Sequence, residues 1–242
     1  MKKKMRNPLW KRLPRELVGD IGKYLVIFLF MTATIGFVSG FLVADESMLE
    51  AYDESFEKYR IENGNFTLDS QATEEKLEEL EQEGVTIYEN FYLDEPVDVD
   101  LDGTSDGTMR IFKKREEVNL VCLMKGTFPE TADEIAIDRM YADNNFLAVG
   151  DTITVGGKEL KITGLVALSD YSALFSDPGD LMFDSVKFGV SVLSPEGFAA
   201  FPDTHMKYCY SWLYEKKPAD DTEEKEMADD FLEVLTAEED IS

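Results

Sequence analysis

The feature that most constrains this chain is an uncharged stretch from Tyr24 to Ala44, which reads YLVIFLFMTATIGFVSGFLVA. It contains 21 residues, and Lys23 and Asp45 flank it. A helix rises about 1.5 Å per residue, so this stretch just crosses a hydrocarbon core of roughly 30 Å. A buried core helix seldom stays apolar on every face for this length. The stretch therefore predicts a single transmembrane helix at 24–44.

A cleavable signal peptide would also place an apolar segment near the N-terminus. Such peptides have an apolar run of roughly 7–15 residues and small residues before the cleavage site. The run here is longer, and Leu42 stands where a small residue would be required. We therefore expect the span to be retained.

The charges on either side of the span predict its orientation. Residues 1–23 contain eight basic and two acidic residues, which leaves 16 basic and 48 acidic residues in 45–242, a net charge of −32. Because Lys and Arg beside a span stay in the cytoplasm, we expect a cytoplasmic N-terminus and an extracytoplasmic bulk of the chain. Such an acidic domain would repel the phosphates of nucleic acid, so no nucleic-acid partner is expected.

The segment before the span, residues 1–23, is expected to be a basic amphipathic elbow in contact with membrane lipid. Leu9, Trp10 and Leu13 are among the apolar residues that recur near helical spacing, with Lys and Arg between them. Trp beside basic residues is typical of a helix that lies among lipid head groups. A disordered basic tail that only sets the topology is the alternative.

Inside the span, Gly36 and Gly40 form a G-x-x-x-G pattern. Two small residues at this spacing lie on one helix face and let a second helix approach closely. We therefore predict that Gly36 and Gly40 are helix-packing residues and that the span has neighbouring helices.

The residues that follow the span continue a helical pattern. Met48, Tyr52, Phe56 and Tyr59 recur every three or four residues, with charged residues between them. This pattern predicts an amphipathic stalk helix over 45–63, ended by Asn63-Gly64. A surface helix of the following domain is the alternative.

Residues 64–242 alternate between strand and helix patterns and predict an extracytoplasmic mixed α/β domain, so that the whole chain is of the α+β class. This domain is expected to contain strand–helix–strand units and a β-hairpin subdomain. The hairpin turns at Gly156-Gly157. It forms one core or two subdomains, 64–130 with 186–242 and 131–185. The expected strands are 65–68, 85–93, 109–113, 118–124, 134–138, 152–155, 158–168, 188–193 and 208–214, and the expected helices are 73–83, 139–145, a short helix capped by Ser194, and 222–236.

No motif in the sequence predicts a catalytic, cofactor-binding or metal-binding residue. The stretch from Asp98 to Gly103 begins like a calcium-binding EF-hand loop, but the twelfth position holds Met109 where that loop needs a Glu. The lone histidine, His205, has no nucleophile motif beside it. We therefore expect no enzyme activity, no cofactor and no metal site.

The two cysteines, Cys122 and Cys209, are far apart in the sequence. Outside the cytoplasm they could form a disulfide, but both lie in apolar, strand-like runs where single buried thiols are common. Both alternatives remain open at this point.

Several stretches together resemble FtsX-like (MacB-type) ABC transporter permeases. They are the basic elbow, the span with its GFVSG, the acidic stalk, and residues 134–139 (EIAIDR), 149–155 (VGDTITV) and 161–171 (KITGLVALSDY). In that family the first span leads into an extracytoplasmic core domain, and further spans follow. Those spans are missing from this sequence, so we expect a fragment of a permease or a truncated homologue.

The resemblance implies a permease subunit of a bacterial cell membrane that couples ATP hydrolysis to movement of its extracytoplasmic domain. Its implied partners are a separate cytoplasmic ABC ATPase and other permease helices or a second permease copy. A continuous helix would transmit the motion, with Gly64 as the expected joint. The alternative is a membrane-tethered binding or sensor module without an ATPase, whose ligand surface would be the Ser169–Ser185 loop and the aromatic face of Tyr208–Tyr214.

Overall fold

The computed structural model describes residues 18–171, 173–177 and 179–237, so most of the predicted elbow lies outside the described residues. The chain forms two compact units that divide between Glu54 and Ser55, and each is considered by itself.

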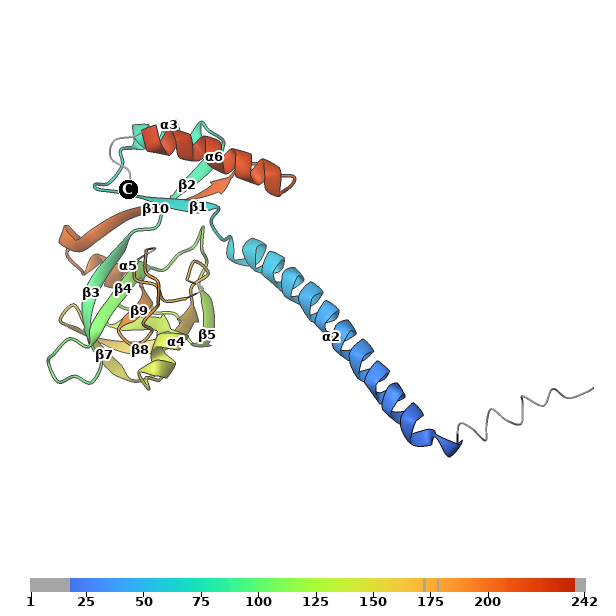
Figure 1. Ribbon diagram of the computed structural model, residues 1–242. Helices are drawn as coiled ribbons and strands as arrows, with labels where there is room; N and C mark the ends of the chain where they lie inside the picture. The colour runs from blue at the N-terminus through green and yellow to red at the C-terminus, as the bar shows by residue number, and fades with distance from the viewer. Residues whose placement is uncertain (1–17, 172, 178, 238–242) are drawn as a thin grey trace, which may run out of the picture. The chain divides into compact units, whose positions relative to one another are not determined.

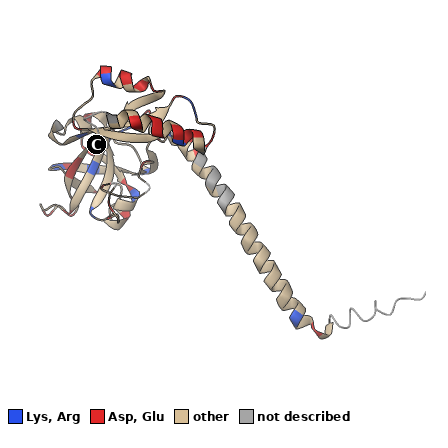
Figure 2. Ribbon diagram, turned by 45° about the horizontal axis from the view of Figure 1, so that its top comes forward, with Lys and Arg blue, Asp and Glu red and all other residues tan. Residues whose placement is uncertain are grey.

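Helix α2 (Ile21–Tyr59) contains the predicted span and the predicted stalk. In the part of the chain that the structure describes, one helix is long and apolar enough to cross a membrane, over the 24 residues Ile21–Ala44, and none of it is buried within the unit. Figure 2 shows no charged residue along this segment after Lys23. The helix ends at Tyr59, before the expected Asn63-Gly64, because Arg60 adopts a left-handed conformation with φ of 47°.

Six strands of the second unit close into a small barrel (Figure 1). In order around the ring they are β3 (Tyr92–Asp98), β4 (Gly107–Lys113), β9 (Phe188–Leu193), β6 (Glu134–Asp138), β8 (Lys158–Ala167) and β7 (Thr152–Val155). Strand β7 closes the ring because it pairs with both β8 and β3. The β4–β9 and β6–β8 pairs are parallel and the other pairs are antiparallel. Strand β5 (Cys122–Gly126) adds to the outside of the ring by pairing with β8.

The barrel is filled by aliphatic side chains from all six strands. The alternation of buried residues along β7 and β8 gives Ile153, Leu160 and Ile162 exposed fractions of 1% or less. Helix α4 (Arg139–Asn144) adds Tyr141, whose ring lies so close to Gly189 of β9 that a Cβ there would be 2.7 Å from it. Helix α5 (Pro195–Ala199) follows β9 and is capped by Ser194, as predicted.

A smaller sheet lies beside the barrel and has its own core. Its strands are β1 (Gly64–Leu68) and β2 (Val85–Glu89), which pair with either side of β10 (Met206–Tyr214). Helices α3 (Glu74–Glu81) and α6 (Asp221–Ala237) cover one face of this sheet (Figure 1). Phe66, Tyr210, Trp212 and Phe231 form the centre of that core. The short helix η1 (Asp203–His205) precedes β10.

The α+β class, with a long apolar N-terminal helix and a mixed domain, is confirmed, and three details differ from expectation. The predicted strand 85–93 is two strands, because the chain passes from the small sheet to the barrel at Asn90 and Phe91. The predicted strand 118–124 begins only at Cys122. The two cores group 64–89 with 208–237 and place 92–206 in the barrel, which is a different grouping from the expected subdomains.

Candidate functional site

The end of α2 receives its cap from a distant part of the chain. The last carbonyl groups of a helix have no partner within the helix. Here the amide of Leu120 donates to the carbonyl of Tyr59 at 2.7 Å, and the amide of Asn119 donates to that of Arg60 at 3.0 Å. The loop before β5 is thereby fixed to the last turn of α2. We call residues 59–63 together with Asn119 and Leu120 the α2 joint.

A reciprocal pair of hydrogen bonds between Glu62 and Asn119 closes the α2 joint. The amide N of Glu62 donates to Oδ1 of Asn119 at 2.9 Å, and Nδ2 of Asn119 donates to the Glu62 carboxylate at 2.6 Å. Asn119 is fully buried and has φ of 48°, a conformation that Asn tolerates better than most residues. Burial, and then the nearby Asp170 charge, raises the pKa of Glu62 above its ordinary value.

The other side of the α2 joint is tied to the small sheet. Asn63 donates its amide to the carbonyl of Trp212 and accepts from the amide of Tyr214 on its side-chain oxygen. Gly64 then begins β1, and a Cβ at this position would lie 2.2 Å from the Trp212 ring. The expectation that Gly64 is the joint is therefore corrected: Gly64 is a packed strand residue, and the chain bends at Arg60 instead.

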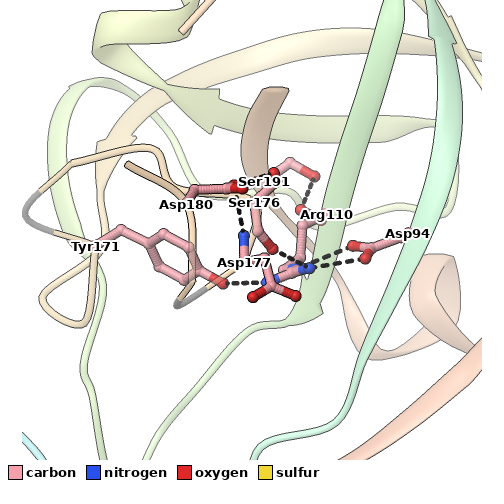
Figure 3. Close-up of polar contacts among 7 residues, drawn as sticks. All are labelled: Asp94, Arg110, Tyr171, Ser176, Asp177, Asp180 and Ser191. Atoms are coloured by element: carbon pink, nitrogen blue, oxygen red, sulfur yellow. Dashed lines mark hydrogen bonds and ion pairs between the residues drawn. The ribbon is translucent and has the colours of Figure 1, made fainter. Parts of the chain in front are cut away.

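Arg110 joins the barrel to the loop that follows β8 (Figure 3). Its guanidinium group makes two bonds to the Asp94 carboxylate of the neighbouring strand, at 2.7 and 2.8 Å. It also donates to the Tyr171 hydroxyl and to the Ser176 carbonyl, both at 3.0 Å. Burial alone would lower the pKa of Arg110, but the bonds to Asp94 and Tyr171 raise it above its ordinary value, so the group stays charged.

Two further contacts fix the same loop, one to Arg115 after β4 and one within the loop itself. Arg115 is bonded to Asp170 at 2.7 Å, and their side chains are only 6% and 10% exposed. The Ser176 hydroxyl donates to Asp180 at 2.6 Å, as Figure 3 also shows. Burial raises the pKa of the Tyr171 phenol to about 12, so the hydroxyl that accepts the Arg110 bond is uncharged at neutral pH.

A cleft of about 790 Å³ lies between this loop, the barrel and the small sheet. Thr67 and Cys209, on the face of the small sheet that the helices do not cover, line it together with Glu62 of the α2 joint. Tyr92 and Arg110 line it from the barrel, and Tyr171 lines it from the loop. The cleft therefore borders the α2 joint.

The predicted helix-packing residues are exposed in this single chain. Apart from the helix's own neighbouring backbone, no atom of the described residues lies within 4 Å of the position where a Cβ would stand on Gly36 or Gly40. Their role in packing stays a prediction.

The aromatic face of β10 is core rather than a ligand surface. Tyr210 and Trp212 are 0% and 4% exposed and pack against Phe66 and Phe231 beneath the helices. The Ser169–Ser185 loop, in contrast, does border the cleft through Tyr171, Ser176 and Asp177.

The acidic turn and the histidine that the sequence singled out do not line this cleft. Carboxylate oxygens of Asp98, Asp100 and Asp106 lie within 4.8 Å of one another, and each carboxylate also accepts a backbone amide of the same turn. His205 contacts the buried carboxylate of Glu95 at 2.9 Å.

Both cysteines are free in the structure. Cys122 accepts a bond from the Tyr59 hydroxyl at 3.1 Å, which is a further contact to the last turn of α2. Cys209 is buried in β10, and burial raises the pKa of its thiol to about 11.

Sequence reasoning missed the residues that build this site: Asn119, Arg110, Arg115 and Glu62. Basic residues in an otherwise acidic domain were the available clue for the two arginines, because Arg is the side chain best suited to buried carboxylate pairs. No local pattern marks Asn119, whose partners are distant in the sequence.

Three solved structures are similar to this chain. The extracellular domain of the noncanonical ABC-type transporter YknZ from Gram-positive bacteria has 12% identity and a TM-score of 0.40, covering 74% of this chain and 98% of that one. The periplasmic region of MacB from Actinobacillus actinomycetemcomitans has 10% identity and a TM-score of 0.41, covering 75% and 88%. A domain of a putative permease protein from Porphyromonas gingivalis has 12% identity and a TM-score of 0.33, covering 63% and 69%. No protein-family model and no curated protein matches the chain.

Proposed function

We propose that this chain is the N-terminal part of an FtsX-like ABC transporter permease that couples ATP hydrolysis in a separate cytoplasmic ATPase to movement of its extracytoplasmic domain. The observation that carries this proposal is the α2 joint. Helix α2 continues without a break from the apolar segment to Tyr59, where Leu120 caps its last carbonyl and Asn119 bonds the carbonyl of the next residue, Arg60. A helix attached by its terminal hydrogen bonds passes on rotation or translation, whereas a flexible linker would absorb it.

The α2 joint would distribute such motion to both parts of the domain. Asn119 and Leu120 belong to the loop that leads into β5 of the barrel, whereas Asn63 is bonded to β10 of the small sheet. Displacement of the α2 end would therefore act on the barrel and the small sheet together. Arg110 and Arg115 would transmit it further, to the Ser169–Ser185 loop.

The coupling can be tested with the full-length gene product and its ATPase in nanodiscs. Hydrogen exchange of residues 60–68 and 206–214 is compared with and without a non-hydrolysable ATP analogue. We expect the analogue to change this exchange in the wild type and not in Asn119→Ala, while insertion and nucleotide binding are retained. Asn144→Ala is the matched control, because its amide bonds an exposed serine hydroxyl far from the α2 joint. The same response in Asn119→Ala as in the wild type would reject the role of the joint.

The span is proposed to pack against other permease helices through Gly36 and Gly40. Two Leu side chains there would hold neighbouring helices apart, although they favour insertion. We expect Gly36→Leu/Gly40→Leu to insert normally but to lower ATPase rate and recovery of the complex, with Leu29→Ile as control. Unchanged assembly and turnover would instead favour the membrane-tethered binding module, which the cleft supports as the second candidate.

The orientation is tested by cysteine labelling in a bacterial cell. After replacement of Cys122 and Cys209 by Ser, a cysteine at Lys3 should react only from the cytoplasmic side. One at Asp220 should react only from outside, because the basic residues lie before the span and the acidic domain after it. Labelling of both sites from the same side would contradict this topology.

A further inference from the structure

We propose that the cleft beside the α2 joint binds a protonated amine or guanidinium group carried on an aromatic body. The cleft has a volume of about 790 Å³, which is in the range of sites for small organic molecules. This inference rests on the groups that line the cleft and does not depend on an ATPase partner.

An unpartnered acceptor lines the cleft. Asn90 is 6% exposed and lies where the chain passes from the small sheet to the barrel. Its Oδ1 is buried and accepts no hydrogen bond from the residues that the structure describes. A buried acceptor without a partner costs free energy. Because this oxygen has almost no accessible surface, a ligand N–H would pair with it only after the Asn90 side chain turns toward the cleft.

The charges that line the cleft also favour a cation. Arg110 is neutralised by Asp94, and Asp170 is neutralised by Arg115. Among the described charged residues that line the cleft, the two carboxylates of Glu62 and Asp177 then exceed the single free cation, Lys207. The bonds to the Glu62 carboxylate come from the neutral amides of Asn65 and Asn119, so this partly buried carboxylate lacks a basic partner among the described residues. An ammonium or guanidinium group would supply the charge that it lacks.

Aromatic rings provide the surface for the body of the ligand. Tyr92, Phe112 and Tyr171 form a chain of neighbouring rings along the cleft, with centroids 5.6 and 6.0 Å apart. The guanidinium groups of Arg110 and Arg115 already lie over the Tyr92 and Phe112 rings, 4.2 and 4.1 Å from their centres, so these rings contact cations within the protein itself. Phe175 at the rim is partly exposed and extends the apolar surface.

Three probes that differ only in the charged group test the proposal. They are tyramine, its uncharged counterpart tyrosol, and the anion 4-hydroxyphenylacetate. Binding is measured by saturation-transfer NMR on the full chain in zwitterionic nanodiscs, with empty nanodiscs as the blank. We expect tyramine to bind about fivefold or more tightly than tyrosol, and the anion not to bind. Equal binding of tyramine and tyrosol, or no binding of tyramine up to about 10 mM, would overturn the proposal.

Two conservative variants locate the site. Asp177→Asn removes a carboxylate at the rim and should weaken tyramine binding about threefold, whereas Lys207→Gln removes a competing cation and should strengthen it by a similar factor. The matched controls are Asp229→Asn and Lys225→Gln, which lie on the exposed face of α6 and should change nothing. Because all four positions are exposed, the variants should keep the wild-type melting temperature. Unchanged affinity in both Asp177→Asn and Lys207→Gln would place the binding elsewhere and reject this cleft.

Discussion

The barrel and the small sheet are stabilised in different ways. Each of the six barrel strands has a partner on both sides, and the interior is filled by aliphatic residues with almost no exposure. In the small sheet, β10 is the one strand among the described residues with which β1 and β2 pair, and the aromatic core depends on two helices that cover one face. A closed ring has no free edge and resists deformation, whereas an open three-stranded sheet can bend.

Strand β10 belongs to both the barrel and the small sheet. The difference in rigidity between these two parts can therefore bear on function. Met206 and Lys207 pair with β3 of the barrel, and the strand from Tyr208 onward pairs with β1 and β2. The α2 joint contacts both parts as well. We expect the barrel to act as the rigid body and the small sheet as the part that yields. The predictions that follow test this comparison, beginning with the largest effect.

Truncation inside the barrel should destabilise the whole domain. Ile137 of β6 is fully buried, and its strand has neighbours on both sides. Ile137→Ala should lower the free energy of unfolding by about 4 kcal/mol, through lost burial and a cavity that the closed ring cannot collapse. Urea unfolding followed by circular dichroism gives the value, with Leu181→Ala, an exposed site, as the control. A loss below that of a typical surface substitution would show that the ring can adapt.

Truncation in the core of the small sheet should destabilise that sheet and its helices but not the barrel. Phe231 of α6 is 2% exposed and packs edge-on against Trp212, with ring centroids 4.9 Å apart. Phe231→Ala should cost about 3 kcal/mol and raise hydrogen exchange in β1, β2 and α6. Exchange in β6, β8 and β9 should stay at the wild-type level. An equal rise in the barrel strands would mean that the two parts unfold as one unit.

A clash at the start of β1 should lower the free energy of unfolding by a still smaller amount. An added Cβ at Gly64 would meet the Trp212 ring, which sits in the part of the domain expected to yield. Gly64→Ala should therefore cost about 1–3 kcal/mol. In a double-mutant cycle, Trp212→Leu should make room for the Cβ, so the cost of Gly64→Ala should fall in that background. Additive effects would show that the strain arises elsewhere.

Elements with a strong local signal could be predicted from the sequence. The long apolar helix follows from an uncharged run, α5 follows from the cap Ser194, and the β7–β8 hairpin follows from Gly156-Gly157. Each of these signals acts between residues close in the chain. Local hydrogen bonds and hydrophobic periodicity therefore sufficed.

Features that depend on distant partners could not be predicted. Ring closure requires Val97 to pair with Val155, and no local pattern selects this pairing. The Tyr208–Tyr214 alternation correctly indicated one shared face, but whether helices or a ligand cover that face depends on α3 and α6. The hydrogen bonds that Asn119 makes at the end of α2 could not be predicted either, because its partners are distant in the sequence. The candidate site could therefore be identified only from the tertiary structure, whereas most of the strands that carry it could be predicted from the sequence.

The smallest expected effect concerns the proton on Glu62, at the boundary between the two parts. Burial, together with the Asp170 charge, raises the pKa of Glu62 above 4.5 in the folded state. A carboxyl group with a raised pKa favours the folded state fully below its unfolded value, and this contribution is lost as pH rises through the folded value. Glu62→Gln cannot titrate, so the stability of the wild type relative to this variant should fall as pH rises through that window. Urea unfolding at a series of pH values measures the difference, and Glu226→Gln on the exposed face of α6 serves as the control. A difference that rises with pH would mean that the joint stabilises the charged carboxylate, and the proton would then loosen the contact between α2 and the small sheet.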